Sequence, residues 1–186
     1  DRPWETCMTI CRQWSWKPDD KMKSLQECIH ALVRTAGGDG NFLFNVGPMP
    51  DGRIEPRQVE RLKEMGEWLG PRGDSIYATR GGPFKPGPWG ACTRKGKRIF
   101  IHILKWPEAG EILLPAVSAK VLSASLLTGG AVEVASDGAG LRLAVPVSMR
   151  DPIDTVVAVD IDVDAMGLAP IATTEPSLCD GAKAKG

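Results

Sequence analysis

The sequence has no long apolar run and no excess of one charge. Lys plus Arg and Asp plus Glu each number 23 among the 186 residues, so the formal net charge is zero. Such a balance gives no general attraction for a phosphate backbone or an anionic bilayer. A membrane-spanning helix needs about 18 or more consecutive apolar residues, and no such stretch occurs. We therefore predict neither nucleic acid nor a membrane as a partner.

The beginning of the chain lacks an initiating methionine and a secretory leader. It is DRPWETCMTI, without the basic region and apolar core that define a signal peptide. A strand-like run begins only a few residues after Asp1. We therefore expect a further part of the protein to precede this chain.

Cysteine is too scarce and too irregularly spaced for a dense disulfide framework, since the chain has five. Cys7, Cys11, Cys28 and His30 form an alternative set of metal ligands. However, they lack the tight C-x-x-C pair that is typical of zinc sites, and Cys28 falls on the apolar side of an expected helix. We expect these thiols to be small apolar side chains, and we predict no metal and no cofactor.

The first part of the chain alternates between strand and helix patterns. Short apolar runs at 7–10 and 41–48 are typical of buried strands. Apolar residues recur every three or four positions at 21–36 and 55–70, which predicts two amphipathic helices. This alternation indicates an α/β protein with parallel strands.

Local signals mark the ends of these helices. Asp19 or Asp20 is expected to cap the first helix, and the GGDG sequence at 37–40 ends it. Pro56 suits the first turn of the second helix, where its missing N–H costs nothing.

The second part has many turn residues and few helix signals. Glycine and proline become dense after residue 70, and short β-rich runs separated by turns follow. Several such runs without helices predict an antiparallel sandwich. The runs are 98–104, 111–115, 119–127, 131–135, 141–147 and 154–163.

Two strand–helix units are too few to close a core, because a parallel sheet is covered on both faces and has further strands beside it. We therefore predict the fold class α/β plus all-β. Residues 1–71 are expected to be the last two βα units of a TIM-like (β/α)8 barrel. Residues 72–164 are expected to form a C-terminal antiparallel β-sandwich, followed by an irregular tail over 165–186.

Three motifs carry a family resemblance: WETCMTI with WSW at 14–16, then GGDGNFLFNVGPMPDGRI, then EMGEWLGPRGDSIYATRGGPF. Their order and spacing over residues 4–84 resemble those of the family-29 glycoside hydrolases, the α-L-fucosidases. The chain departs from the family's W-G-Y pattern, with Ser15 for the glycine and Trp16 for the tyrosine. After residue 84 the resemblance is weaker, although the family has a small C-terminal β domain.

The resemblance implies a retaining hydrolysis that releases terminal α-linked L-fucose from fucosylated oligosaccharides or glycoconjugates. Retention requires two carboxyl groups about 5–5.5 Å apart. The family's nucleophile is an Asp on an earlier barrel strand, and no part of this chain matches that motif. His30 and His102 do not match the family's fucose-binding histidines. We therefore expect the N-terminal barrel portion as a partner, and no activity from this chain alone.

An alternative function is a non-catalytic carbohydrate-binding β-sandwich module. Trp89 and Trp106 support this alternative if they are exposed and stack on sugars, but singly placed tryptophans usually pack inside. The two α/β units argue against it, because a standalone sandwich has no use for them. We expect Trp68, Ile76 and Tyr77 to form a hydrophobic joint between the two parts.

Glu5 is the candidate acid/base. It lies beside Trp4 in the sequence, and a carboxyl group held against an indole has its pKa raised by desolvation. The structural alternative is a buried glutamate satisfied by backbone groups or by an arginine. The family's acid/base varies in position between subgroups, so a residue before Asp1 is a second alternative.

Trp14 and Trp16 are the candidate substrate-binding residues. The family places an aromatic side chain near position 14 against the apolar face and methyl group of fucose, and burial of that methyl is favourable. Trp16 replaces a family tyrosine and is expected to pack nearby. A core role that anchors the loop after the strand is the alternative for Trp14. Asn45, at the end of the next strand, either points into the site or satisfies backbone groups there.

Overall fold

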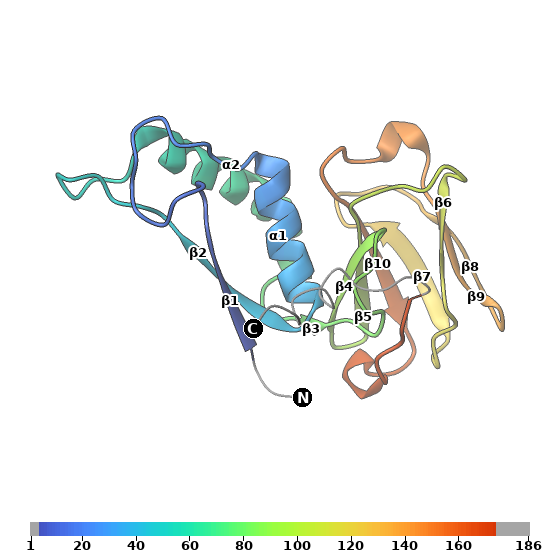
Figure 1. The fold of residues 1–186 in the computed structure, drawn as a ribbon. Coiled ribbons are helices and arrows are strands. Elements are labelled where there is room, and N and C mark those ends of the chain that lie inside the picture. Colours follow the sequence, from blue (N-terminus) through green and yellow to red (C-terminus); the bar gives the residue numbers. More distant parts are fainter. Residues whose placement is uncertain (1–3, 174–186) are drawn as a thin grey trace.

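A computed structural model describes residues 4–173 of the chain. Its first part contains two strand–helix units, which Figure 1 shows beside a separate group of strands formed by the rest of the chain. These units give the strand–helix–strand–helix order that the sequence predicts. The elements are β1 (Trp4–Thr9), α1 (Leu25–Gly37), β2 (Gly40–Asn45) and α2 (Pro56–Arg72).

Helix α1 begins later than the sequence pattern predicts, and neither Asp19 nor Asp20 caps it. Ser24 is the cap: its hydroxyl accepts a hydrogen bond from Glu27 N at 3.1 Å, and the Glu27 carboxylate accepts one from Ser24 N at 2.7 Å. This reciprocal pair satisfies two backbone N–H groups that a bare helix end leaves free. The helix ends at Gly37, as the GGDG sequence predicts.

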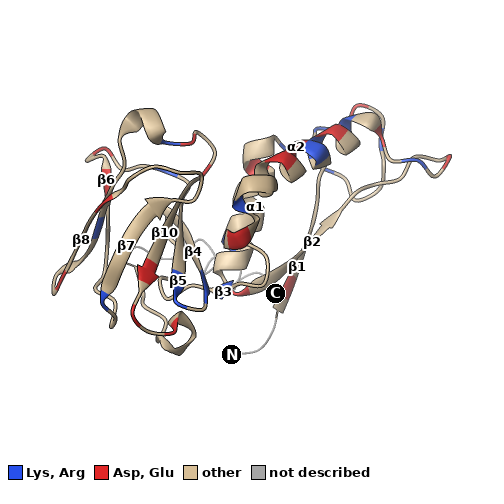
Figure 2. Ribbon diagram, turned by 180° about the vertical axis from the view of Figure 1, so that it is seen from behind, with Lys and Arg blue, Asp and Glu red and all other residues tan. Residues whose placement is uncertain are grey.

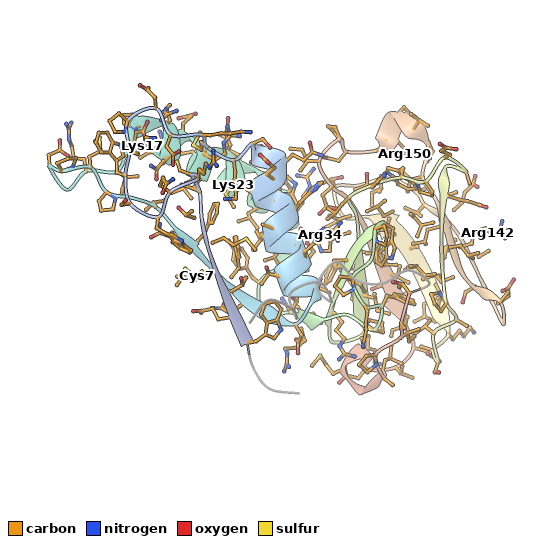
Figure 3. The ribbon with its side chains drawn as sticks, in the orientation of Figure 1. Cys7, Lys17, Lys23, Arg34, Arg142 and Arg150 are labelled. Atoms are coloured by element: carbon orange, nitrogen blue, oxygen red, sulfur yellow. The ribbon has the colours of Figure 1, made fainter. Side chains whose placement is uncertain are left out.

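Strands β1 and β2 pair in parallel, with Trp4 opposite Gly40 and Thr9 opposite Asn45. Successive side chains of a strand point to opposite faces. One face carries Phe44, which packs into a core cluster with α1. The opposite face is open: Leu43 is 51% exposed, and Cys7 points away from α1 (Figure 3).

The second part forms two antiparallel sheets, with strand orders β3-β4-β5-β10-β7 and β6-β9-β8. Each of the six β-rich runs of the sequence overlaps one of these strands. The strands are β3 (Arg80–Gly81), β4 (Gly90–Lys95), β5 (Arg98–Ile103), β6 (Glu111–Leu114), β7 (Val121–Leu126), β8 (Glu133–Asp137), β9 (Gly140–Ala144) and β10 (Thr155–Ile161).

The sequence pattern missed β3 and β4. Strand β4 has the sequence GACTRK, in which small and polar residues hide the strand signal. It is nevertheless buried, because β5 pairs along its whole length and α1 packs against it. Gly37 of α1 lies so close to Ala91 of β4 that a Cβ at position 37 would stand 2.6 Å from the Ala91 Cβ.

Side chains of the two antiparallel sheets share one buried cluster, which includes Ile101 and Val159 from one sheet and Leu114 and Leu143 from the other. This arrangement is compatible with the expected sandwich. The chain also contains the short 3-10 turns η1 (Gly73–Ser75), which directly follows α2, η2 (Val147–Met149) and η3 (Ala165–Gly167).

A second buried cluster joins the two parts of the chain. Val33 and Trp68 from the helices share it with Ala91 and Leu104 from the β-rich part. Trp68 therefore has the joint role predicted for it, and Ile76 packs against the same cluster. Tyr77 does not, since it is 60% exposed.

The chain after Ala165 is less loose than predicted. Ala165 is fully buried, and its backbone N–H donates to Gly96 O at 2.7 Å. Further on, Ile171 N donates to Pro83 O at 2.6 Å, which fixes this segment against the strand edge. The remainder of the predicted tail, from residue 174, lies outside the described residues.

Charged side chains of both signs are spread over the surface, as Figure 2 shows along α2 and the loops of both parts. Among the described residues, no helix has the length and apolar character to cross a membrane.

Candidate active site

The carboxyl ends of β1 and β2 lie side by side, because Thr9 and Asn45 are paired residues at the last position of each strand. The Asn45 amide donates to Thr9 Oγ1 at 3.2 Å and to the Trp14 carbonyl at 2.9 Å. Thr9 Oγ1 in turn donates to the Gln13 carbonyl at 3.1 Å. These bonds tie the loop after β1 to the strand ends, so Asn45 satisfies backbone groups, which was one of its two predicted roles.

Asp20 fixes the other side of the same loop. Its carboxylate accepts backbone hydrogen bonds from Gln13 N at 2.8 Å and from Lys21 N at 2.9 Å. The Gln13 amide is the main cause that lowers the pKa of Asp20 below its ordinary value. The sequence pattern offered Asp19 or Asp20 as the helix cap, because the same side-chain chemistry serves caps and loops.

Trp14 lies at the tip of this loop and is 57% exposed. Among the described residues no side chains bury this indole as a core anchor, so the binding role and the loop-anchoring role both stay predictions. Active sites of βα barrels are built from the loops at this edge. The position is therefore suited to contact with a ligand.

Trp16 is partly buried between the two loops that leave the strand ends. Gly47, in the loop after β2, lies directly against the backbone of Ser15 and Trp16. Glu55 lies at the end of that second loop, and its bond with Arg57 is the main cause that lowers its pKa. The Trp16 indole acts weakly in the same direction. Trp16, two residues after Trp14, is therefore less accessible than Trp14, and its packing against Trp14 stays a prediction.

Glu5 lies at the other end of β1. It is exposed on the open face of the sheet and accepts a hydrogen bond from the Asn41 side chain opposite it. Four residues of strand, at about 3.3 Å each, place it roughly 13 Å from Thr9. The structure therefore does not bring Glu5 to Trp14.

Trp4 is not packed against Glu5, because the two residues are neighbours in a strand and point to opposite faces. The Trp4 indole N–H donates to the Gly38 carbonyl at 3.0 Å, and its ring covers Gly40. The desolvation of Glu5 by an adjacent indole, expected from the sequence, is therefore wrong.

The cysteines and histidines considered as metal ligands are distributed over separate environments. Cys28 of α1 is buried in the cluster that joins the two parts of the chain, and burial raises its pKa to about 11. His30 Nε2 is 2.8 Å from Ile153 O, at the joint between the two parts. Within the described residues, no three His, Cys, Asp or Glu side chains are grouped as a metal site. Cys179 lies outside those residues.

The two tryptophans of the β-rich part are used for packing. Trp89 and Trp106 both contact the buried cluster that the two antiparallel sheets share. The Arg150 guanidinium covers the Trp106 ring at 3.9 Å from its centroid, a cation–π contact that occupies the face a sugar would need. This arrangement does not favour the carbohydrate-binding module.

Comparison with known proteins places these features in a family. The alpha-L-fucosidase family model matches residues 1–74. An alpha-L-fucosidase of Branchiostoma floridae is 31% identical over 167 residues, which cover 81% of this chain and 36% of that protein. The human plasma alpha-L-fucosidase is 34% identical over 120 residues, covering 60% of this chain and 26% of that protein.

Solved structures agree with the sequence matches. Alpha-L-fucosidase isoenzyme 1 from Paenibacillus thiaminolyticus superposes with a TM-score of 0.77 at 30% identity, over 86% of this chain and 40% of that one. The Thermotoga maritima alpha-fucosidase gives 0.71 at 30% identity, over 84% and 39%. The chain thus spans about two fifths of the length of these structures. By its sequence and its fold, the chain belongs to the α-L-fucosidase family of glycoside hydrolases.

Proposed function

We propose that this chain is the C-terminal portion of a retaining α-L-fucosidase, which releases terminal α-linked L-fucose from fucosylated glycans. The observation that carries the proposal is the exposed Trp14 indole at the carboxyl edge of two βα units in a chain of this family. Relatives that match the chain by sequence are named α-L-fucosidases. Their substrate class is therefore the first candidate for this protein.

The open face of β1 and β2 supports a larger barrel. Parallel strands are normally covered on both faces, whereas here Cys7 and Leu43 are exposed on one. An isolated two-stranded sheet also has two free edges, each with unpaired backbone groups. We propose that further parallel strands pair with these edges and close a (β/α)8 barrel around the open face.

Trp14 would contact the sugar through its apolar side. Fucose is a 6-deoxy sugar, and its methyl group gains about 0.8 kcal/mol when it leaves water for an apolar surface. The flat indole adds area for the C–H groups of the pyranose ring. Trp16 is proposed to support Trp14 from the side rather than to bind the sugar directly.

Retention of configuration requires a nucleophile and an acid/base carboxyl group about 5–5.5 Å apart. We propose that the nucleophile is an Asp outside this chain. Glu5 as the acid/base stays a hypothesis. Its distance from the carboxyl edge and its bond with Asn41 favour a structural role on the open face of the sheet. The acid/base is then also contributed by a part of the protein before Asp1.

The function is tested on the complete protein with an aryl α-L-fucoside. We expect release of the phenol, and NMR of the first sugar product should show the α anomer before mutarotation. Matched aryl α-L-rhamnoside and β-D-galactoside should be poor substrates. Fast release from another glycoside with none from the fucoside would contradict the substrate, and the β anomer would contradict the retaining mechanism.

A further inference from the structure

We propose that Asn45 and Gly47 are positioning residues that hold the Trp14–Trp16 segment at the strand edge, and so set the preference for a sugar that carries the methyl group. The proposal rests on the proposed function, because Trp14 is the sugar contact in it. Neither residue needs to touch the sugar, since both act on the backbone of the segment.

The first contact is the Asn45 amide. It donates to the Trp14 carbonyl at 2.9 Å and also to Thr9 Oγ1 at 3.2 Å, so one side chain links both strand ends to the residue that carries the indole. Asn45 is fixed by its place in β2, where it pairs with Thr9. The carbonyl of Trp14 is thus hydrogen-bonded to a residue of a paired strand, β2, rather than to another loop.

The second contact is steric. A Cβ on Gly47 would stand 2.5 Å from Trp16 N and 2.9 Å from the Ser15 carbonyl carbon. Both neighbours are backbone atoms, which cannot rotate aside as a side chain would. Only glycine therefore allows the loop after β2 to lie directly against the Ser15–Trp16 peptide.

The position of the Trp14 indole is not fixed by packing of its own side chain. It is 57% exposed, so packing restrains it little, and its direction depends on the backbone that carries it. That backbone is held at three places: by Asn45 at Trp14, by Gly47 at Ser15–Trp16, and by Asp20 at Gln13. Two of the three lie in or next to β2, which makes the end of this strand the main support of the segment.

The consequence for specificity is measurable. One buried methyl group is worth about 0.8 kcal/mol, and 1.4 kcal/mol is tenfold, so full contact gives about a fourfold preference in kcat/KM for the methyl-bearing sugar. Loss of the Asn45 or Gly47 contact should remove most of that preference. Because these contacts act through Trp14, substitutions at Asn45 or Gly47 should leave the preference unchanged in a variant that lacks Trp14.

The position of the indole is tested first, without any substrate. The complete protein is labelled with 5-fluorotryptophan, and the Trp14 signal in the ¹⁹F spectrum is assigned with Trp14→Phe. Asn45→Asp keeps the size of the side chain but removes both N–H donors, and Gly47→Ala adds the Cβ. Gly66→Ala is the matched control, since a Cβ on this α2 residue meets nothing within 4 Å.

We expect the Trp14 signal to shift or broaden in Asn45→Asp and Gly47→Ala, while the other tryptophan signals and those of Gly66→Ala stay in place. An unchanged Trp14 signal in both variants would overturn the positioning role. Circular dichroism identifies a variant that is unfolded. If Gly47→Ala is unfolded, the two Asn45 variants carry the test. Asn45→Asp removes the N–H donors and adds a negative charge, whereas Asn45→Ala removes the donors without a charge, so a shift common to both belongs to the lost hydrogen bonds.

The preference is then measured as the kcat/KM ratio of an aryl α-L-fucoside to the same glycoside without the methyl group. Asn45→Asp should lower the ratio about two- to fourfold in the parent and leave it unchanged in a Trp14→Ala background. An equal loss in both backgrounds would overturn the proposal. If Trp14→Ala alone leaves the ratio unchanged, the sugar contact of the proposed function is wrong, whereas the NMR result still decides the positioning role.

Discussion

The buried pair of His102 and Asp154 predicts a large loss of stability on substitution. His102 Nδ1 and Asp154 Oδ2 are 2.7 Å apart, and both side chains are fully buried. His102 lies in β5 between Ala91 of β4 and Val156 of β10. Within the described residues, neither His102 Nε2 nor Asp154 Oδ1 has another hydrogen-bond partner. Each side chain thus depends on the other.

Asp154→Ala leaves the imidazole in the interior without its partner. A buried polar group that loses its hydrogen-bond partner costs about 1–3 kcal/mol, so Asp154→Ala should lower the free energy of unfolding by about that amount. Asp154→Asn keeps an oxygen that can accept a hydrogen bond from Nδ1, so it should cost about 1 kcal/mol, the worth of an ordinary hydrogen bond. The informative quantity is how much more the free energy of unfolding falls in Asp154→Ala than in Asp154→Asn.

The assay is denaturant unfolding of the complete protein, followed by far-UV circular dichroism. Glu133→Ala, an exposed residue of β8, is the control and should change the free energy of unfolding by less than about 0.5 kcal/mol. Equal and small losses for Asp154→Ala and Asp154→Asn would refute the reasoning, since they would mean that water reaches the His102 side chain.

Other predictions concern the site and the open face. Glu5→Gln should cut turnover on natural fucosides by roughly 10²–10⁴-fold if Glu5 is the acid/base. Rescue of activity by azide with an activated aryl fucoside would support that role. An equal loss of activity on all substrates, with a lowered Tm, would show that Glu5 is a structural residue. The isolated chain should show no turnover of an aryl α-L-fucoside, and turnover that survives repurification would contradict a nucleophile outside it. At pH 8, the exposed Cys7 of the isolated chain should react with a thiol reagent before Cys92, whose pKa burial raises to about 12; in the complete protein Cys7 should be protected, unless no further strands cover that face. The lowered pKa of Asp20 means that its carboxylate stabilises the fold above the ordinary aspartate pKa of about 3.9, and that this contribution is lost as the pH falls through the folded value. In a plot of the free energy of unfolding against pH, Asp20→Asn should therefore make the decrease at acid pH less steep.

Periodicity was enough to predict the larger elements of the fold. The apolar spacing located α1 and α2, the glycines after residue 36 located the end of α1, and the short apolar runs located β1, β2 and six strands of the β-rich part. These signals are local, since each depends on residues within one or two turns or along one strand. The motifs at 4–84 likewise indicated the family, because they require only order and spacing.

Contacts between distant segments decided the remaining features. Strand β4 is buried by α1 and β5 despite its small and polar residues, and the Trp4 indole covers Gly40 of the neighbouring strand because β1 and β2 pair at that position. The roles of Asn45 and Gly47 toward the Trp14–Trp16 segment depend on two loops that are about 30 residues apart in the sequence and meet only because β1 and β2 pair in parallel. Local sequence fixes which side chains are available, whereas strand pairing determines which of them meet.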